Sequence, residues 1–297
     1  MNPAAKIETV AELVADGKAN LRVAVVTGAG SGIGRELALA CAREGMDVAI
    51  ADVEPVALRA TETLLQAMDV HCIARCVDVS KFDEVEAFAQ TCWDTWGHVD
   101  WLFNNAGVAV LGPAWDATDD DWDWVFGVNL RGVANGVRSF VPRMRRSGRP
   151  AHIVNTASAA GLATTPGSAV YCASKHAVVA FSECLAQDLE QAGVPIGVSV
   201  LCPSLVQTGI GQSQRNRPAD LSQTVAPAPS YDERIRLGMA ASAVSAEDVA
   251  AFTLQGIRSG LFYLVTHPQT GSSVERKMNR ILTDFRAGPA GDTPAAL

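Results

Sequence analysis

A glycine-rich segment near the start of the chain, TGAGSGIG at residues 27–34, most constrains the fold. The apolar run 22–27 before it has the pattern of a short buried strand, and residues 33–44 after it have helical spacing. Glycines let such a turn approach an anion closely, and the free N–H groups of the following helix attract that anion. A strand, a glycine turn and a helix in this order predict a binding site for the pyrophosphate of a dinucleotide. The residues expected there are Gly28, Ser31, Gly32, Ile33 and Gly34.

Segments with strand and helix patterns alternate along most of the chain. Further strands are predicted at residues 46–51, 71–77, 101–104, 152–156, 194–202 and 262–266. Further helices are predicted at 55–67, 82–96, 119–146 with a bend near Gly127, 168–191, and from Ser245 onwards. This alternation indicates an α/β fold of Rossmann type, a doubly wound parallel sheet of about seven strands with helices on both faces. We expect a single domain over residues 22–286, preceded by an extension at 1–21 and followed by a flexible tail at 287–297.

The composition fits a globular interior and argues against several classes of protein. Hydrophobic residues make up 48% of the chain, and a net charge of −8 makes binding to nucleic acid or to an anionic membrane unfavourable. Residues 1–20 lack the basic and apolar regions of a signal peptide, and no apolar stretch approaches the ~18 residues that span a bilayer. The seven cysteines form no CxxC pair and the histidines have no metal-ligand spacing, so neither a disulfide framework nor a metal site is expected. We therefore expect a cytoplasmic protein with reduced thiols.

Acidic residues close the second and third predicted strands. Asp52 stands where a carboxylate can accept both hydroxyl groups of an adenosine ribose and repel a 2′-phosphate. Asp78 and Val79 can hold the adenine ring, the carboxylate by its exocyclic amine and the valine by packing. Ser31 and Val53 occupy positions where an NADP site usually supplies Arg or Lys. The sequence therefore favours NAD as the cofactor, and a solvated strand-end carboxylate is the alternative interpretation of Asp52.

Tyr171 and Lys175 are four residues apart in a predicted helix and so share one face of it. A free phenol has a pKa near ~10, and a nearby ammonium group stabilises the phenolate and lowers that value. The pair therefore makes a usable general acid and base, although a Tyr–Lys pair in isolation is more often a surface pair. Ser158 follows the fifth predicted strand, where its hydroxyl can donate to a substrate oxygen in the cofactor crevice. Asn129 can bend the long helical region and hold a water beside Lys175.

These motifs together resemble the short-chain dehydrogenase/reductase family. The glycine segment, Asp78-Val79, Asn104-Asn105-Ala106-Gly107, Asn129, Ser158 and Tyr171-x-x-x-Lys175 occur in the order and spacing of that family, over residues 22–208. The resemblance implies a catalytic tetrad of Asn129, Ser158, Tyr171 and Lys175, in which Lys175 also binds the nicotinamide ribose.

The resemblance also implies two further groups of cofactor contacts. Asn105, Ala106 and Gly107 would brace the sheet beside the cofactor. Within residues 203–208, Pro203, Val206 and Thr208 would contact the nicotinamide amide, with Thr208 as its hydrogen-bond partner. The chain departs from the family at Ser204, where a glycine usually follows the proline, and this adds a small polar side chain near the nicotinamide.

The predicted helix 168–191 is apolar almost all round. Apart from the face that carries Tyr171, it has a stripe of small residues, Ala173, Ala177, Ala180 and Cys184. A helix without a polar face is buried on more than one side. Family members that resemble this chain pair through this helix, so we expect a homodimer or homotetramer, with cover by the chain's own loops as the alternative.

Residues 209–244 form a long, polar, proline-containing segment between a strand and the next capped helix. In the family this region carries the substrate lid, whose candidate wall residues here are Leu221, Tyr231, Leu237 and Met239. A lid of this length suggests a bulky substrate. The stretches GVNLRGV and FVPRM also resemble bacterial dehydrogenases of aryl carbinols, including those that act on lignin dimers.

The expected activity is NAD-dependent interconversion of a secondary alcohol, aromatic or alicyclic, and its ketone. One alternative is a non-catalytic NAD-binding protein that senses redox state, which would not need Tyr171 and Ser158 together. Another is epimerisation or dehydration with bound NAD, although such relatives tend to have a larger substrate domain than 297 residues allow.

Overall fold

The computed structural model describes residues 22–221 and 229–287. Seven parallel strands form one sheet in the order β3-β2-β1-β4-β5-β6-β7. The strands are β1 (Val23–Thr27), β2 (Asp47–Asp52), β3 (Cys72–Cys76), β4 (Trp101–Asn104), β5 (Ala151–Thr156), β6 (Ile196–Cys202) and β7 (Tyr263–Val265). The order reverses direction beside β1, so the predicted doubly wound sheet is confirmed.

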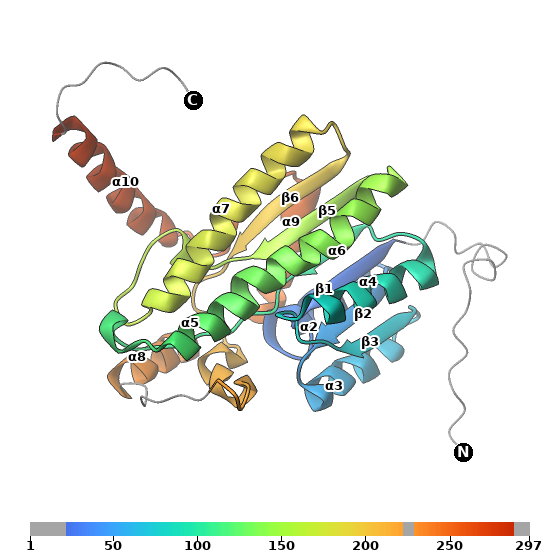
Figure 1. Ribbon diagram of the computed structural model, residues 1–297, viewed down its shortest axis with the longest axis horizontal. Helices are drawn as coiled ribbons and strands as arrows, with labels where there is room; N and C mark the ends of the chain where they lie inside the picture. Colours follow the sequence, from blue (N-terminus) through green and yellow to red (C-terminus); the bar gives the residue numbers. More distant parts are fainter. Residues whose placement is uncertain (1–21, 222–228, 288–297) are drawn as a thin grey trace.

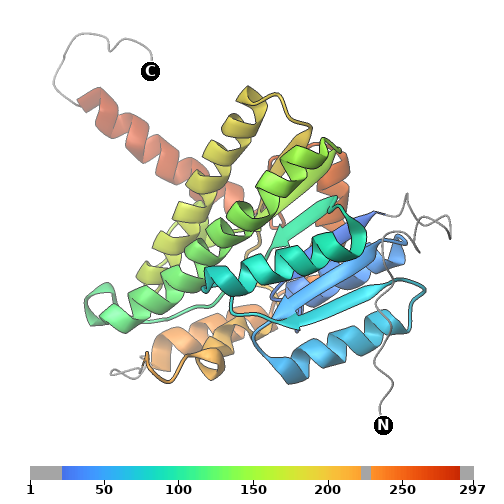
Figure 2. The ribbon, with the colours of Figure 1, turned by 45° about the vertical axis from the view of Figure 1, so that its right-hand side comes forward.

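Helices cover both faces of this sheet (Figures 1 and 2). One face carries α2 (Gly32–Arg43), α3 (Pro55–Gln66) and α9 (Ala246–Arg258), and the other carries α4 (Phe82–Trp96), α6 (Gly132–Ser147) and α7 (Ala169–Gln191). Along β1, Val23 and Val25 belong to the core under the second group, while Ala24 and Val26 belong to the core under the first. Both faces are apolar because both are covered, which explains the continuous hydrophobic runs in the sequence.

The long helical region is two helices, as predicted, but the junction has a specific form. Helix α5 (Asp119–Phe126) is followed by a π-helical turn, η3 (Gly127–Arg131), and then by α6. A π-turn is wider than an α-turn and shifts the side chains that follow it around the helix axis. This turn lies where the sequence analysis expected a bend, at Gly127.

Two segments differ from the sequence-based prediction. The lid segment begins with η5 (Gly209–Asn216) and includes α8 (Pro229–Ala240), so much of it is helical. A helix that the sequence analysis did not predict, α10 (Thr270–Ala287), follows β7 and extends away from the sheet (Figure 1). Its exposed apolar residues are Met278, Ile281, Leu282 and Phe285.

All seven cysteines are free, and four of them, Cys41, Cys92, Cys172 and Cys202, are buried. Within residues 22–221 and 229–287, no helix has both the length and the apolar character needed to cross a bilayer. The same ranges contain no group of three or more His, Cys, Asp or Glu residues placed to hold a metal ion.

Candidate active site

A cavity of about 1090 Å³ lies at the carboxyl edge of the sheet. It is lined by the segments that follow all seven strands, so the topology brings residues from the whole chain to one place. The sequence-predicted cofactor residues all line it: Gly28, Ser31, Gly32, Ile33, Gly34, Asp52, Asp78, Val79, Asn105, Ala106, Gly107, Tyr171, Lys175, Pro203, Val206 and Thr208. Ser158 lines it too, whereas Asn129 lies behind the wall.

The glycine turn is packed so closely that side chains cannot fit. Gly28 has φ +65°, and a Cβ atom there would lie 2.7 Å from the Cα of Ala106. A Cβ on Gly34 would lie 2.1 Å from the carbonyl oxygen of Gly28. The Ser31 side chain does not cap α2, so the first N–H groups of that helix remain open toward the cavity. This arrangement fits a pyrophosphate, because backbone donors and a helix N-terminus converge where only glycine fits.

The segment after β4 braces the turn after β1. Thr27 Oγ1 accepts hydrogen bonds from the backbone N–H groups of Asn105, at 2.9 Å, and of Ala106, at 3.2 Å. The side chain of Asn105 donates to the Thr27 carbonyl at 3.1 Å. The bracing role that the family resemblance implied for residues 105–107 therefore has a direct geometric basis for the first two of them.

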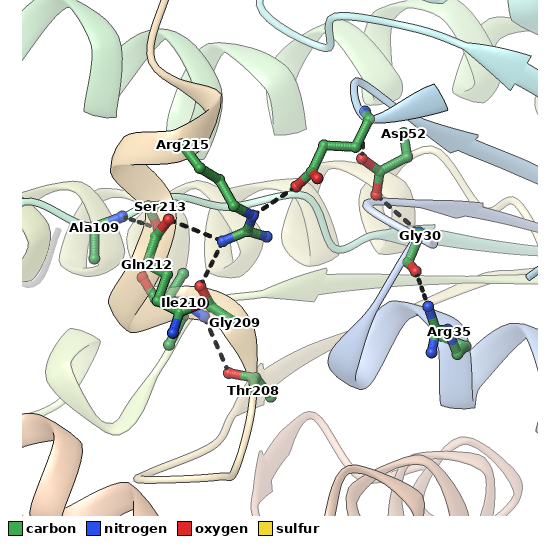
Figure 3. Close-up of polar contacts among 11 residues, drawn as sticks. Gly30, Arg35, Asp52, Ala109, Thr208, Gly209, Ile210, Gln212, Ser213 and Arg215 are labelled. Carbon is green, nitrogen blue, oxygen red and sulfur yellow. Dashed lines mark hydrogen bonds and ion pairs between the residues drawn. The ribbon is translucent and has the colours of Figure 1, made fainter. Parts of the chain in front are cut away.

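Asp52 is fixed at one edge of the cavity by two backbone donors. Its Oδ2 accepts from Gly30 N at 2.8 Å and its Oδ1 from Glu54 N at 2.9 Å (Figure 3). Each carboxylate oxygen keeps a lone pair for another donor, as a ribose contact requires. Asp78 is likewise fixed, because its Oδ1 accepts from both the N–H and the hydroxyl of Ser80.

Asn129 lies in the π-helical turn and is fully buried. Its Oδ1 accepts from Val108 N at 2.8 Å, and its Nδ2 donates to the Val108 carbonyl at 3.0 Å and to Ser174 Oγ at 2.9 Å. The Asn129 Oδ1 and Lys175 Nζ atoms face the same small space, since a Cβ placed on Gly107 would lie 3.4 and 3.3 Å from them. The wide turn therefore directs Asn129 inward, next to Lys175.

Ser158, Tyr171 and Lys175 come together between β5 and α7. The Tyr171 phenol is hydrogen-bonded to Ser158. Lys175 is 2% exposed, its Nζ donates to the Thr156 carbonyl at 2.8 Å, and it lies 5.8 Å from the centre of the Tyr171 ring. The predicted helical face therefore does carry both side chains to the end of β5.

The pKa of Tyr171 differs from the sequence-based expectation. Burial raises the pKa of Tyr171 to about 12, although the Ser158 hydrogen bond acts to lower it. Burial also lowers the pKa of Lys175 to about 8. Desolvation penalises the charged form of both groups and outweighs the attraction between an ammonium and a phenolate. Lys175 alone therefore does not bring the Tyr171 pKa below its free value, and the expected lowering by Lys175 together with the oxidised nicotinamide stays a prediction.

The segment after β6 lies against the glycine turn. A Cβ on Gly32 would lie 3.1 Å from Thr208 Cγ2, so Thr208 closes over the start of α2. Ser204 lines the cavity, and its backbone N–H donates to His267 Nδ1 at 3.3 Å. This backbone hydrogen bond ties the segment after β6 to a buried histidine after β7.

The other end of the cavity has mainly apolar walls. Of the predicted lid residues, Leu221 and Met239 line it, but Leu237 is 54% exposed and lies outside it, so that expectation is wrong. The side chain of Tyr231 lies outside the described residues. Wall residues that the sequence analysis missed are Leu111, Trp124, Leu205, Ile210 and Ile235, together with Gln269, Thr270 and Ser273 at the start of α10. No sequence motif marks these positions. Leu205 and Gln269 lie in segments that follow strands, whereas Trp124 and Ile235 lie in helices.

Comparison with known proteins agrees with this geometry. The family model described as short chain dehydrogenase matches residues 22–219. The crystal structure of a short chain dehydrogenase/reductase from Burkholderia phymatum in complex with NAD is similar, with a TM-score of 0.87, 41% identity, and coverage of 93% of this chain and 98% of that one.

Two named dehydrogenases are also similar. The 1-deoxy-11-beta-hydroxypentalenate dehydrogenase of Streptomyces exfoliatus is 38% identical over 248 residues, 83% of each chain. The C alpha-dehydrogenase of a Sphingobium species is 30% identical over 270 residues, 88% of this chain and 85% of that enzyme. The predicted family resemblance is confirmed, and the chain belongs to the short-chain dehydrogenase family.

Proposed function

We propose that this protein is an NAD(H)-dependent oxidoreductase that interconverts a secondary alcohol and its ketone. One observation carries the proposal: the half-buried Tyr171 and the buried Ser158 and Lys175 meet in the same cavity wall as a glycine turn suited to a pyrophosphate. A protein that only binds a dinucleotide needs the turn but has no use for a phenol, a hydroxyl and an ammonium at the opposite end.

Each side chain has a distinct part in the proposed mechanism. Tyr171 takes the hydroxyl proton of the alcohol during oxidation and returns it during ketone reduction. Ser158 hydrogen-bonds the substrate oxygen as its charge changes. Lys175 stabilises the phenolate and binds the nicotinamide ribose, and Asn129 keeps Lys175 and a water in position. When bound, the nicotinamide accepts or donates the hydride, and its oxidised form adds a positive charge that favours the Tyr171 phenolate.

We propose NAD as the preferred cofactor. The Asp52 carboxylate supports this preference, because two backbone N–H groups hold it at the cavity edge with lone pairs left for a ribose diol. A 2′-phosphate at that position would face the same negative charge. Pro203 and Thr208 also line the cavity, and we assign them to the nicotinamide amide.

We propose a bulky substrate with aromatic or alicyclic rings. Leu111, Trp124, Ile210, Ile235 and Met239 give the far end of the cavity apolar walls. The similarity to dehydrogenases named for a hydroxypentalenate and for a C alpha position supports the same substrate class.

The assembly and location are also proposals. Along α7, Ala180 and Cys184 are exposed and Ala173 and Ala177 half-buried, which supports pairing of two copies through this helix in a homodimer or homotetramer. The seven free thiols support a reducing compartment, the cytoplasm.

The test is a panel of aryl and alicyclic secondary alcohols with NAD, followed by NADH absorbance, for the native protein and Tyr171→Phe. Turnover should fall by at least ~10²-fold in the variant, because the proton acceptor is gone, while NADH binding changes little. Tyr263→Phe is the matched control, since its hydroxyl contacts Glu183 outside the cavity. Near-normal turnover of folded Tyr171→Phe would refute the mechanism, and NADH binding without turnover of any alcohol would favour the redox-sensing alternative.

A further inference from the structure

An ion pair joins the lid segment to the turn that follows β2. Arg215, in η5, donates from Nε to Glu54 Oε1 at 2.8 Å, although the two residues are 161 positions apart. Both residues line the cavity, and their side chains are 38% and 32% exposed. Figure 3 shows Arg215 extending from the lid toward the turn that carries Asp52. A cation from the substrate side of the enzyme therefore reaches the ribose end of the proposed cofactor site.

The guanidinium of Arg215 is held in place by the backbone of its own segment. Its Nη1 donates to the carbonyl oxygens of Gly209 and Gln212, both at 2.9 Å (Figure 3). Gly209 leaves room for it, because a Cβ there would lie 3.1 Å from Nη2. That Nη2 atom has no hydrogen-bond partner among the residues that the structure describes. The guanidinium is thus pre-positioned, with the N–H groups of Nη2 available to another acceptor.

Three charged side chains line the cavity at this edge. Asp52 and Glu54 are negative, and Arg215 is positive. Asp52 and Glu54 are linked directly, because Asp52 Oδ1 accepts from the Glu54 backbone N–H. Arg35 is also near the glycine turn, but it bonds to the Gly30 carbonyl and Thr61 Oγ1 and does not line the cavity. Among the described residues, the cation that lines the cavity beside Asp52 and Glu54 is Arg215.

Three other cations line the cavity: Lys175 beside Tyr171, and Lys81 and Arg131 at the adenine end. Lys81 closely follows Val79, and Arg131 precedes Gly132, whose Cβ position is 2.7 Å from the Val79 side chain. They therefore belong to the Asp78–Val79 end, and the ribose end depends on Arg215.

We propose that Glu54 and Arg215 form a second determinant of the choice between NAD and NADP, an inference that rests on the proposed dinucleotide site. Glu54 adds a negative charge beside the ribose and occupies the guanidinium that would otherwise bind a 2′-phosphate. Loss of Asp52 alone leaves this arrangement intact. Loss of Glu54 as well changes the local charge from two negatives and a positive to a single positive, with Arg215 free to pair with phosphate.

The experiment measures the dissociation constants of NADH and NADPH by cofactor fluorescence, which needs no substrate. The variants are Asp52→Ser, Asp52→Ser with Glu54→Gln, and the triple variant that adds Arg215→Gln. The double variant should bind NADPH about fivefold or more tightly than Asp52→Ser does, since a partly exposed phosphate–guanidinium pair contributes about 1 kcal/mol. Arg215→Gln should cancel that gain and leave NADH binding nearly unchanged.

Two further comparisons serve as controls. Asp52→Ser with Glu247→Gln removes the same kind of charge from an ion pair with Arg43 outside the cavity, so it should leave NADPH binding at the level of Asp52→Ser. If Asp52→Ser unfolds, as thermal melting would show, Glu54→Gln with and without Arg215→Gln gives the same comparison in the native background.

The outcomes separate this inference from the proposed function. An NADPH gain that depends on Arg215 and shrinks at high salt supports the inference. No gain from Glu54→Gln, a gain that survives Arg215→Gln, or equal losses of NADH and NADPH on Arg215→Gln would overturn it. Failure of the native protein to bind either dinucleotide would overturn the proposed function instead.

Discussion

Replacement of the buried Lys175 by methionine should stabilise the fold while it abolishes turnover. Burial lowers the pKa of Lys175 from 10.5 to about 8. At pH 7 the charged form therefore destabilises the folded protein by about 3 kcal/mol relative to the unfolded chain. Methionine has a similar length without the charge, and the lost hydrogen bond to the Thr156 carbonyl offsets about 1 kcal/mol of the gain. The free energy of unfolding should thus rise by about 2 kcal/mol at pH 7.

The sign of the pH dependence is fixed by the order of the two pKa values. The pKa of Lys175 is lower in the folded protein than in the unfolded chain. The cost of burying the charged ammonium is therefore complete below pH 8, where both states hold the proton. It shrinks between pH 8 and 10.5, where only the unfolded chain keeps the proton, and vanishes above that range. The advantage of Lys175→Met should therefore be largest at pH 7 and nearly lost at pH 10.5. Raised pKa values at groups distant from Lys175, such as the buried Cys41 thiol, affect both proteins alike.

Urea unfolding followed by tryptophan fluorescence at pH 7 and pH 10.5 measures this difference, with six tryptophans as probes. Lys81→Met is the matched control, because Lys81 is exposed and its substitution should change stability by less than about 0.5 kcal/mol. Two results would refute the reasoning from desolvation. One is a Lys175→Met protein that is less stable than the native one at pH 7. The other is a difference in free energy of unfolding between the two proteins that is the same at both pH values.

Two other outcomes follow from the packing. Gly34→Ala should lower the free energy of unfolding by about 1–3 kcal/mol and weaken NADH binding, because the new Cβ would lie 2.1 Å from the Gly28 carbonyl oxygen. Urea unfolding and cofactor titration measure the two effects. Gly271→Ala is the control, because nothing lies within 4 Å of the Cβ position there. Equal stability of the two variants would contradict the close packing of the turn. Ala180→Arg on the exposed side of α7 should reduce the oligomer to a species near 31.2 kDa in light scattering, whereas a native protein that is already monomeric would exclude pairing through α7.

The parts of the fold that depend on local pattern could be predicted from the sequence. Helix 82–96 was predicted with its observed bounds, since Gly97 adopts φ +72° and ends it, and Ser245 with Asp248 forms the capping box expected at the start of α9. Helix α10 was missed although Met278, Ile281, Leu282 and Phe285 have helical spacing. These side chains are exposed, so the usual link between an apolar stripe and a buried face does not hold for them.

Some parts of the candidate site could likewise be predicted from the sequence, and others could not. The glycine turn and the Tyr171–Lys175 spacing are local motifs, and the structure brings them to one cavity. The direction of the Tyr171 pKa was not predictable, because it depends on burial by segments distant in sequence. The same holds for the pair between Glu54 and Arg215, where no motif spans 161 residues and only the tertiary structure makes them neighbours.

The π-helical turn at Gly127–Arg131 makes the site sensitive to the number of residues in this part of the chain. Such a turn holds one residue more than an α-turn, so deletion of a single residue there would restore a regular helix. The side chains of α5 and α6 would keep their faces, because the wide turn is what absorbs the extra residue, whereas the residues inside the turn would point in new directions. Asn129 would lose its contacts to Val108 and Ser174, while the sheet and its hydrophobic cores would be spared. A deletion of one residue in this turn should therefore impair the site while the protein still folds.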